Sequence, residues 1–578
     1  MLALWLLVVA TGAVGLPSGV FRVPLDPAGN TALFWSLHYP SSTVHLEAHV
    51  PSLLFGSWFA LGFSDYGLFT DADFCLLWAD PQGNVRLQDS WTDDKGLLWE
   101  DEQQDCDDLR YVVEANVTKF SFSRQFDTCD VHDYCIEEGT THIVWAKGGG
   151  GWDSMEGMSV QSGLKGMQRV QLLKNLETIE DVLPEQKDVF GVTVTSDRVK
   201  VPSLETTYWC HVTKLPQELS QLHHIVKFES VIQEGNEGLV HHMELFHCEA
   251  DRGQELPLYR GPCQHADRPN STQVCKKVLA AWAMGASAFH YPKAAGLPVG
   301  GENFNLHVML EVHYNNPEMK ADWVDSSGLR IYLTKKLRRY NAGVIELGLE
   351  YIDKMAIPPK QPAFNLTGYC IAQCTAVALP EGGVTVFGSQ LHTHLAGTRV
   401  ATRHLEGSSG REMPLLNWDN HYSTHFQEIR LLKRPVTLMP GDALITTCTY
   451  NTQDRDNITL GGFAISDEMC VNYIYYYPKV DLEVCKSSIS DQALKNYFDM
   501  MKTLEGQRTG SELPISQAYG GIEWNPVRTR VLAALYEESP IYMQCNSSSG
   551  ARFPGNWEAM PLARVTRPLP PASRPCPP

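Results

Sequence analysis

Short runs in which apolar and polar positions alternate dominate the first part of the chain. Two of them are TVHLEAHV at residues 43–50 and YVVEANV at residues 111–117. Turn-forming sequences such as Asp80-Pro81-Gln82-Gly83 separate such runs. Alternation with a period of two is typical of strands that bury one face. Residues 30–147 are therefore predicted to form a β-sandwich, and the glycine patch at 148–151 reads as a linker.

Two further segments carry the same pattern of short strands divided by Pro and Gly. One runs from about residue 183 to 345 and the other from about residue 346 to 480. The segment 271–287 is open between a helix and a buried strand, because it mixes glycine with β-branched residues. The clearest helical pattern lies at 490–501, and the Pro- and Arg-rich last thirty residues are predicted to be extended. The predicted fold class is all-β.

An uncharged apolar run of about 14 residues opens the chain, from Met1 to about Leu16. It is too short to span a bilayer and ends in small residues, so we interpret it as a secretory signal peptide, although it lacks Lys and Arg. No later stretch approaches the roughly 18 apolar residues that a spanning helix needs. The mature protein is expected to have no transmembrane segment and to be secreted or to lie in the lumen of the secretory pathway.

Sequons and cysteines agree with this compartment. The N-glycosylation sequons are at Asn116, Asn270, Asn365, Asn457 and Asn546. The fifteen cysteines are dispersed and include no paired set of the zinc type, since CIAQC at 370–374 lacks a second half. In a secreted chain this distribution predicts a disulfide framework, and the odd number leaves at least one cysteine outside it or paired with another chain.

Length and charge limit the classes of function. The chain has 578 residues, which suggests roughly three or four domains. Hydrophobic residues make up 43% and charged residues 20%, as in globular proteins with a sizeable core. The net charge is −20 and no long run of Lys and Arg occurs, so nucleic acid is not an expected partner.

Histidine pairs are the candidate chemistry. In VTVFGSQLHTHL (384–395), Gln390, His392 and His394 would share one face of a strand, which makes the two imidazoles a bidentate ligand. Adjacent residues on a regular strand point apart, so His241 and His242 could bind one metal only at a bulge or a strand end. A second adjacent pair, at 223–224, receives no role. Taken alone, each pair is more often structural than functional.

Two single residues complete the candidate set. In FNLHVMLEVHYNN (304–316), alternate residues from Val308 to Tyr314 would pack on one face, and His313 lies on the other. Met469 lies in the loop-like stretch GGFAISDEMC. A lone strand histidine is usually hydrogen-bonded, and a lone methionine usually fills core space. Together, however, imidazole and thioether ligands suit copper, because a thioether binds Cu(I) well and zinc, calcium or magnesium poorly.

Seven short sequences, in this order and spacing, resemble the copper type II, ascorbate-dependent monooxygenases, in particular the dopamine β-hydroxylase-like members. They are TTYWC (206–210), HHMELFHC (241–248), LEVHYNNP (310–317), GYCIAQC (368–374), SQLHTHLAGT (389–398), CTYNT (448–452) and EMCVNYIYYYP (468–478). The resemblance implies a DOMON β-sandwich followed by two jelly-roll-type copper domains. The expected division is a signal peptide at 1–16, the DOMON domain at 30–147, copper domains at 183–345 and 346–510, and a tail with some helix at 511–578.

The same resemblance implies two copper ions per subunit. One, for electron transfer, would be held by His241, His242 and His313. The other, where oxygen is activated, would be held by His392, His394 and Met469. Tyr208 and His392 match positions regarded as catalytic in the family, whereas Tyr208 could equally be a packing residue. Tyr450 and Glu346 are weaker candidates for lining a substrate cavity.

Disulfide pairs are also implied by the resemblance. They are Cys210–Cys263, Cys248–Cys275, Cys370–Cys485, Cys374–Cys545, Cys448–Cys470 and Cys129–Cys576. Cys75, Cys106 and Cys135 have no family partner, and a Cys75–Cys106 bond with Cys135 left over is one possibility. A crosslink at Cys470 would hold the loop that presents Met469.

The implied reaction is hydroxylation of a C–H bond of a small, amine-type substrate with O2, with ascorbate as electron donor. An alternative is a catalytically silent, secreted copper-binding or interaction protein of the same fold. A zinc hydrolase is a poorer reading, because the chain has no HExxH motif and a thioether is an unusual zinc ligand. The family analogy also suggests a homodimer formed through the tail and the DOMON domain.

Overall fold

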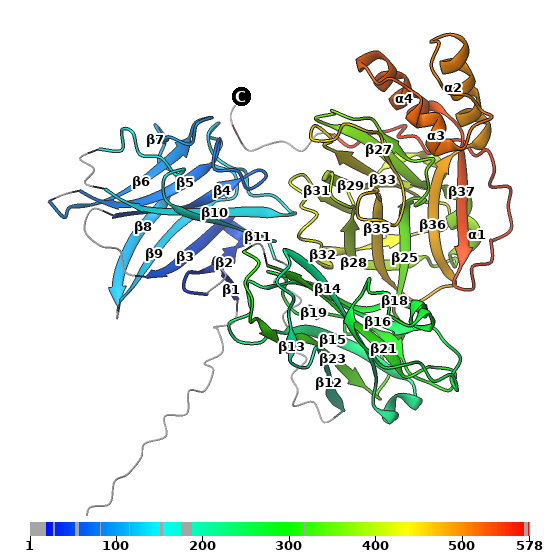
Figure 1. Ribbon diagram of the computed structural model, residues 1–578, viewed down its shortest axis with the longest axis horizontal. Helices are drawn as coiled ribbons and strands as arrows, with labels where there is room; N and C mark the ends of the chain where they lie inside the picture. Colours follow the sequence, from blue (N-terminus) through cyan, green and yellow to red (C-terminus); the bar gives the residue numbers. More distant parts are fainter. Residues whose placement is uncertain are drawn as a thin grey trace, which may run out of the picture.

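Strands dominate the computed structural model of the chain, which confirms the all-β prediction. The structure describes residues 19–26, 29–51, 57–80, 82–114, 116–150, 154–174, 188–316, 318–570 and 576. The expected signal peptide lies outside these residues. The described chain folds into three sandwiches: an N-terminal one (blue and cyan in Figure 1), a middle one (green) and a C-terminal one (yellow to red). Among the described residues, no helix has the length and apolar character to cross a membrane.

The N-terminal sandwich consists of two antiparallel sheets. One has the order β1-β2-β3-β9-β8, with β1 (Val20–Pro24), β2 (Ala32–His38), β3 (Thr43–Pro51), β9 (Val117–Gln125) and β8 (Asp107–Glu114). The other has the order β11-β10-β4-β5-β6-β7, with β11 (Leu164–Val170), β10 (Thr141–Gly149), β4 (Ser57–Ser64), β5 (Asp73–Ala79), β6 (Val85–Thr92) and β7 (Leu98–Glu100). As the alternation in β3 predicts, Val44, Leu46 and Val50 are fully buried.

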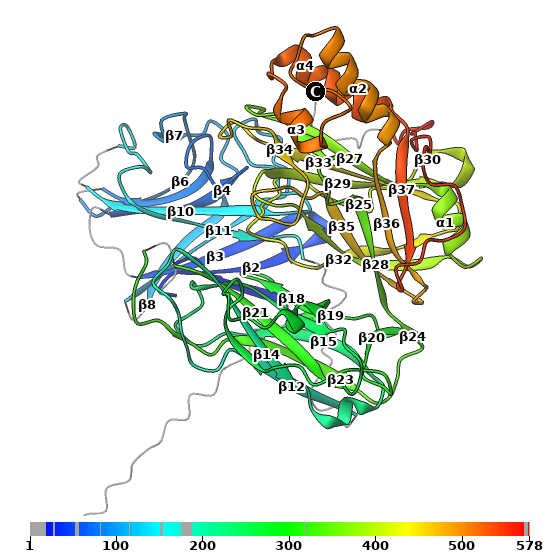
Figure 2. The same cartoon turned by 45° about the vertical axis from the view of Figure 1, so that its right-hand side comes forward.

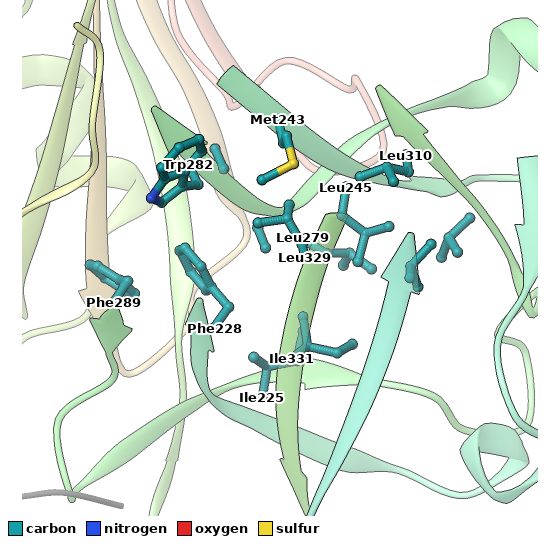
Figure 3. Packing of buried hydrophobic residues seen from close by; sticks show 14 of the residues in the cluster. Ile225, Phe228, Met243, Leu245, Leu279, Trp282, Phe289, Leu310, Leu329 and Ile331 are labelled. Atoms are coloured by element: carbon teal, nitrogen blue, oxygen red, sulfur yellow. The ribbon is translucent and has the colours of Figure 1, made fainter. Parts of the chain in front are cut away.

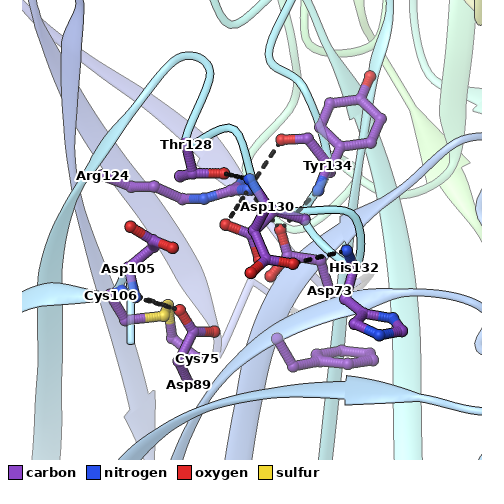
Figure 4. A network of polar contacts seen from close by, with 12 residues as sticks. Asp73, Cys75, Asp89, Asp105, Cys106, Arg124, Thr128, Asp130, His132 and Tyr134 are labelled. Atoms are coloured by element: carbon purple, nitrogen blue, oxygen red, sulfur yellow. Dashed lines mark hydrogen bonds and ion pairs between the residues drawn. A yellow bond between two sulfur atoms is a disulfide. The ribbon is translucent and has the colours of Figure 1, made fainter. Parts of the chain in front are cut away.

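A buried ion network lies inside this sandwich (Figure 4). The Arg124 guanidinium is 1% exposed and lies 2.7 Å from an oxygen of Asp73 and 3.1 Å from an oxygen of Asp133. It also donates a hydrogen bond to the Tyr134 carbonyl. Nearby, Asp89 accepts hydrogen bonds from backbone amides, including that of Cys106. Burial of several carboxylates around one guanidinium makes this region sensitive to the loss of either charge.

The middle sandwich supplies two sheets and a β-pair. The first sheet has the order β12-β23-β15-β20-β24, with β19 paired to β15; its strands are β12 (Val189–Thr195), β23 (Gly328–Thr334), β15 (His223–Val231), β20 (Ala295–Val299), β24 (Tyr340–Asn341) and β19 (Phe289–His290). The second has the order β17-β14-β21-β16-β18, with β17 (Tyr259–Pro262), β14 (Thr206–Lys214), β21 (His307–Asn315), β16 (Val240–Cys248) and β18 (Cys275–Ala283). β13 (Val199–Lys200) pairs with β22 (Val324–Asp325). The segment 271–287, left open by its sequence, therefore supplies strand β18.

The core of the middle sandwich lies between its two sheets (Figure 3). Met243 and Leu245 of β16 and Leu310 of β21 face Ile225 of β15 and Ile331 of β23. The core extends into the C-terminal sandwich through buried Phe387, Ile429 and Tyr475. A continuous apolar core across the two sandwiches holds their facing surfaces in fixed contact.

The C-terminal sandwich contains a larger and a smaller sheet. The larger has the order β32-β28-β35-β25-β36-β37, with β32 (Arg430–Leu438), β28 (Val384–His392), β35 (Val471–Tyr477), β25 (Gly343–Leu349), β36 (Leu482–Ile489) and β37 (Ile541–Ser547). The smaller has the order β27-β33-β29-β30, with β31 paired to β29; its strands are β27 (Phe364–Cys370), β33 (Ala443–Tyr450), β29 (Gly397–Glu406), β30 (Arg411–Glu412) and β31 (Asn417–Asp419). β26 (Ala356–Ile357) pairs with β34 (Thr459–Leu460).

Among the described residues, α-helices occur only in this last part, whereas the earlier parts have short 3-10 helices such as Asn270–Val274. The α-helices are α1 (Ala372–Ala378), α2 (Asp491–Thr503), α3 (Ile515–Gly520) and α4 (Pro526–Glu538), and α2 to α4 gather at one end of the sandwich (Figure 1). α2 agrees with the predicted helix at 490–501, and the Ser490 hydroxyl caps it by accepting the Ala493 amide. After α4 the chain adds β37 to the edge of the larger sheet, so the C-terminal region is part of the fold.

Seven disulfides form among the described residues, which confirms the predicted disulfide framework. The pairs are Cys75–Cys106, Cys129–Cys576, Cys210–Cys263, Cys248–Cys275, Cys370–Cys485, Cys374–Cys545 and Cys448–Cys470. Cys135 is the fifteenth cysteine. The Cys129–Cys576 bond ties the chain's last described residue to the N-terminal sandwich.

Candidate metal centres

His241, His242 and His313 meet on two adjacent strands of the middle sandwich. β16 carries the first two and β21 carries the third, and the ladder places His242 opposite His313. The register shifts between Val240 and His242, so a bulge occurs at His241. Adjacent residues on a regular strand point to opposite faces, and the extra residue of a bulge removes that constraint. The structure thus provides the irregularity that the adjacent histidines require to face one point.

Nδ1 atoms of these three rings converge. The Nδ1 of His242 lies 3.2 Å from that of His241 and 3.2 Å from that of His313. The three possible ligand atoms all lie within 4.8 Å of one another. His241 and His313 are buried, with exposed fractions of 9% and 7%. Imidazole lone pairs gathered in this way repel one another unless a proton or a cation lies among them, so the arrangement suits a metal ion.

Burial keeps these histidines neutral. Desolvation, followed by the charges of His242 and His313, lowers the pKa of His241 to about 2. Desolvation and His313 lower the pKa of His242 to about 3, and desolvation lowers that of His313 to about 4. A neutral imidazole is the form that binds metal, so no proton has to leave these rings near neutral pH.

Tyr208 packs directly on this cluster. It lies opposite His313 in the β14–β21 ladder, and its ring is stacked on the His313 imidazole with centroids 4.5 Å apart and an interplanar angle of 8°. Its ring centroid is 5.8 Å from that of His242. Burial raises the pKa of the Tyr208 hydroxyl, so the phenol stays protonated. The Tyr208 ring therefore holds the His313 imidazole in its orientation.

His392, His394 and Met469 lie at the end of the larger C-terminal sheet. The ladder between β28 and β35 pairs His392 with Val471, so the chain just before Val471 runs beside the chain just after His392. The expectation of one strand carrying both histidines was wrong in part, because β28 ends at His392. His394 instead follows the strand, where its backbone amide donates to a side-chain oxygen of Glu468, 3.0 Å away.

Hydrogen bonds define which nitrogen of each ring is available. Nδ1 of His392 donates to the side-chain oxygen of Gln427, 2.5 Å away, because the Gln427 amide group donates instead to the carbonyls of Thr393 and Thr424. Nδ1 of His394 donates to the Asp467 carbonyl, 3.0 Å away. Each ring therefore keeps its lone pair on Nε2, the arrangement that commonly orients a metal-binding histidine.

A buried carboxylate and a disulfide hold the Met469 segment against the histidines. Glu468 is fully buried and accepts the amides of His394 and Ala396. The Tyr450 hydroxyl donates to the Met469 carbonyl at 2.6 Å. Cys448–Cys470 crosslinks the next residue to β33. Tyr450, expected as a weak candidate for a cavity wall, is fully buried and positions Met469. Glu346, the other weak candidate, forms an ion pair with Lys486 at 2.6 Å.

One loop of the C-terminal sandwich reaches both clusters. It joins β31 to β32 and carries His425 and Gln427. His425 meets His241 edge-on, with ring centroids 5.4 Å apart, while Gln427 holds His392. His392 is close enough to His242 for its charge to lower the pKa of His242. The two histidine clusters therefore face each other across the contact between the two sandwiches.

The N-terminal sandwich anchors this loop. Asp419, at the start of the loop, is fully buried and accepts hydrogen bonds from the Thr140 amide and hydroxyl, at 3.0 and 2.6 Å. Arg430, at its end, lies 2.8 Å from Asp419 and also donates to the Thr140 hydroxyl. Asn420 donates to Glu137 at 2.6 Å. Contacts with a domain distant in sequence thus hold a loop that touches both candidate centres.

Sequence reasoning missed Gln427, His425 and Glu468. Gln427 and His425 lie more than thirty residues after His392 and reach the clusters only through the tertiary fold. Glu468 is adjacent to Met469, and its acidic character in an apolar stretch was the available clue. The unassigned pair at 223–224 is buried at the start of β15, where the His223 ring hydrogen-bonds to the Gln221 carbonyl and the His224 ring to the Asn341 side chain.

Donor atoms at both clusters fit copper. The first cluster offers three imidazole nitrogens, and at the second the backbone segment that carries Met469 runs beside His392 and His394. Imidazole binds both oxidation states of copper, and a thioether favours Cu(I). The second-cluster rings are held by hydrogen bonds on the nitrogen that faces away from the ligand position. Thioether sulfur is a poor ligand for zinc, calcium and magnesium.

Family models match three parts of the chain. Residues 27–148 match the DOMON domain. Residues 192–321 match the N-terminal domain of the copper type II ascorbate-dependent monooxygenases, and residues 340–498 match the C-terminal domain of the same enzymes. These regions correspond to the N-terminal, middle and C-terminal sandwiches.

Relatives align along almost the whole chain. Human dopamine beta-hydroxylase is 44% identical over 560 residues, which cover 96% of this chain and 89% of the relative. Tyramine beta-hydroxylase of Caenorhabditis briggsae is 37% identical, covering 91% of this chain and 87% of the relative. DBH-like monooxygenase protein 1 of Mus musculus is 32% identical, covering 96% and 90%. The chain therefore belongs to the copper type II ascorbate-dependent monooxygenase family, with an N-terminal DOMON domain.

Proposed function

We propose that this chain hydroxylates a C–H bond of a small aromatic amine with O2 and ascorbate, using two copper ions. The proposal assigns His241, His242 and His313 to one ion and His392, His394 and Met469 to the other. The observation that carries it is the pair of clusters facing each other with neutral, oriented imidazoles. The amine class is taken from the names of the relatives, which are dopamine and tyramine beta-hydroxylases.

Unequal surroundings of the two clusters support different roles. At the three-histidine cluster, the Tyr208 ring stacks on His313 and the edge of the His425 ring packs on His241. His392, His394 and Met469 would hold copper at the second cluster, where the thioether would favour copper(I) for the reaction with O2. Copper supplies the redox chemistry of oxygen activation, while the protein holds the ligands and limits access of water.

Residues of this chain would prepare the second cluster before O2 arrives. Gln427 and the Asp467 carbonyl hold the two rings with Nε2 toward the ion, and Tyr450 holds the Met469 backbone. This preorganisation lowers the cost of ordering ligands when the ion binds or changes its oxidation state. In the three-histidine cluster, the stacked Tyr208 ring holds the His313 ring in its orientation.

Secretory features complete the proposal. The disulfide framework and the family indicate a secretory or lumenal protein. We propose glycosylation at the exposed sequon residues Asn116, Asn270, Asn365 and Asn457, with Asn546 less accessible because it is half-buried in β37. We also propose that the protein forms a homodimer through the DOMON domain and the tail.

The direct test is oxygen uptake by copper-loaded protein with ascorbate and a panel of phenylethylamines. The wild type should consume one O2 for each hydroxylated product, and His394→Ala should lose this activity while keeping the three-histidine site. Ascorbate oxidation that is the same in His394→Ala as in the wild type, with no hydroxylated product, would contradict the proposal. That result would favour a copper-binding protein that lacks turnover.

A further inference from the structure

A cavity of about 410 Å³ lies where the three sandwiches meet. Its wall includes His241 and His313 of the middle sandwich, His425 of the C-terminal sandwich and Arg169 of the N-terminal sandwich. His392, His394 and Met469 do not line it. Its volume is within the usual range for small-molecule sites. The cavity therefore gives a small molecule access to the three-histidine centre alone.

Arg169 is the unusual residue of this wall. It is half-buried on β11, and its Nε is buried without a hydrogen-bond partner. Arg169 forms no ion pair with another described residue, and burial lowers its pKa to about 10, so it stays charged. Its charge reaches His241 and His425 and lowers the pKa of both. A buried guanidinium with open hydrogen-bonding capacity beside a cavity is suited to an anion.

Besides apolar residues such as Leu25, Met167 and Met284, the wall carries groups of the opposite charge and neutral amides. Glu205 is exposed, whereas Glu237 and Asp26 are half-buried. Gln168 and Asn315 add amide groups. A ligand that complements these polar groups has an anionic part, which pairs with the guanidinium. It also has neutral hydroxyl groups, which donate hydrogen bonds to the carboxylates and to the amide oxygens.

We propose that this cavity binds the reductant, a monoanionic enediol such as ascorbate, with its anionic ring against Arg169 and its hydroxylated side chain toward Glu237 and Glu205. The proposal rests on the copper monooxygenase function proposed above and specifies where electrons enter. It assigns the N-terminal sandwich a direct part in reductant binding, because Arg169, Gln168 and Asp26 all belong to that sandwich.

An amine substrate fits this cavity less well. Its ammonium group could pair with the carboxylates, but it would leave Arg169 buried and without a counter-charge. Its reacting C–H bond also has to lie beside the centre that binds O2, and no proposed ligand of that centre lines the cavity. A reductant has only to approach the three-histidine centre.

Ascorbate in this cavity would supply electrons to the three-histidine centre one at a time. An ascorbate monoanion loses one electron and one proton and becomes the ascorbyl radical anion. The electron would reduce a copper(II) ion held by the three histidines to copper(I), and the proton would pass to water near exposed Glu205. Two such events supply the two electrons needed when one atom of O2 enters the product and the other becomes water.

Equilibrium dialysis of radiolabelled ascorbate against metal-free, full-length protein under argon tests the site directly. Arg169→Gln should weaken binding about tenfold or more, because it removes a charge-assisted contact. Arg169→Lys should restore part of the affinity. Arg530→Gln, which changes an exposed arginine on α4, is the matched control and should bind like the wild type. Thermal unfolding verifies that each variant is folded.

A second variant keeps the test independent of the buried charge. Thr206 is an exposed wall residue, so Thr206→Trp should fill the cavity and weaken ascorbate binding without disturbing Arg169. In copper-loaded protein, both Arg169→Gln and Thr206→Trp should raise, about tenfold, the ascorbate concentration at which the anaerobic loss of the Cu(II) EPR signal is half-maximal.

Two results would overturn the inference. One is ascorbate binding to Arg169→Gln and Thr206→Trp that equals the wild-type value. The other is full displacement of ascorbate by phenylethylamine, which would make the cavity a substrate site. If the wild type hydroxylates no substrate but binds ascorbate in an Arg169-dependent manner, the monooxygenase proposal fails while the anion site stands.

Discussion

The side-chain oxygen of Gln427 accepts a hydrogen bond from Nδ1 of His392 over 2.5 Å. Since Nδ1 is occupied, Nε2 is the nitrogen left for a metal. Gln427→Leu should therefore weaken copper binding at the His392–His394–Met469 site by about 10- to 100-fold, the usual effect of losing such a partner. Gln427→Glu keeps an acceptor oxygen and should retain most of the affinity.

Chelator competition followed by EPR measures this effect site by site. The three-histidine site should release its copper at the same chelator concentration in Gln427→Leu as in the wild type. Equal weakening of both sites would show that the substitution disturbs the domain contact in general, and the positioning role of Gln427 would then be rejected.

Removal of the Met469 sulfur tests whether the second site is built for reduced copper. Met469→Leu conserves volume but has no thioether, so the affinity for Cu(I) should fall much more than the affinity for Cu(II). X-ray absorption of the ascorbate-reduced protein should show a copper–sulfur scattering path in the wild type and none in the variant. A sulfur path that persists in Met469→Leu would exclude Met469 as the ligand.

The sequence predicted the bulge at His241 and His242 because that constraint is local, whereas the grouping of these residues with His313 was implied only by the family resemblance. Adjacency of His241 and His242 required a bulge, and the ladder with His313 shows one. The spacing of His392 and His394 suggested one regular strand, but β28 ends at His392, because the following residues turn to give their amides to Glu468. A local pattern cannot show a buried carboxylate 74 residues away that ends a strand.

The sequence does not predict the contacts between the domains. Nothing near Thr140 indicates that it binds Asp419, 279 residues later, and nothing near Arg169 indicates a cavity shared with His313. Such contacts depend on how three sandwiches pack. The segment 271–287 was undecided for a related reason: its apolar residues fit a helix or a strand equally, and pairing of β18 with β16 decided it.

Loss of the Asp419 carboxylate should destabilise the contact between the DOMON domain and the C-terminal sandwich. Asp419→Asn leaves the Arg430 guanidinium, 7% exposed, with only the more distant Glu428 carboxylate 3.5 Å away, and should cost about 3 kcal/mol in the free energy of unfolding. Glu138→Gln is the matched control, since its ion pair with Lys433 links the same two domains at the surface and should contribute at most about 1 kcal/mol.

Urea unfolding of the two variants measures this difference. Because the Asp419 loop also carries Gln427, Asp419→Asn should in addition lower copper occupancy at the second site. Equal midpoints for Asp419→Asn, Glu138→Gln and the wild type would contradict the anchoring role of the buried pair.

Stability of the DOMON domain should depend on pH through Asp89. Burial, followed by the charge of Asp133, raises the pKa of this carboxyl to about 7, whereas it is near 3.8 when unfolded. The folded state thus holds a proton that the unfolded state releases. This stabilisation is complete below about pH 4 and is lost as the pH rises through 7, with a change on the order of a few kcal/mol.

Amide hydrogen exchange in β5 and β6 reports on this effect in the full chain. Protection should decrease from pH 5 to pH 8 after correction for intrinsic exchange, and Asp89→Asn should flatten the profile, because an amide does not titrate. A profile that is equally steep in Asp89→Asn would assign the pH dependence to another group.

Incorporation of labelled oxygen tests the monooxygenase function most directly. Copper-loaded protein would be incubated with ascorbate, phenylethylamine-type substrates and ¹⁸O₂, and the products analysed by mass spectrometry beside His394→Ala. The wild type should form a hydroxylated product that carries one ¹⁸O atom, and His394→Ala should form no such product. A product whose oxygen comes from water, or one formed equally by His394→Ala, would contradict the monooxygenase function.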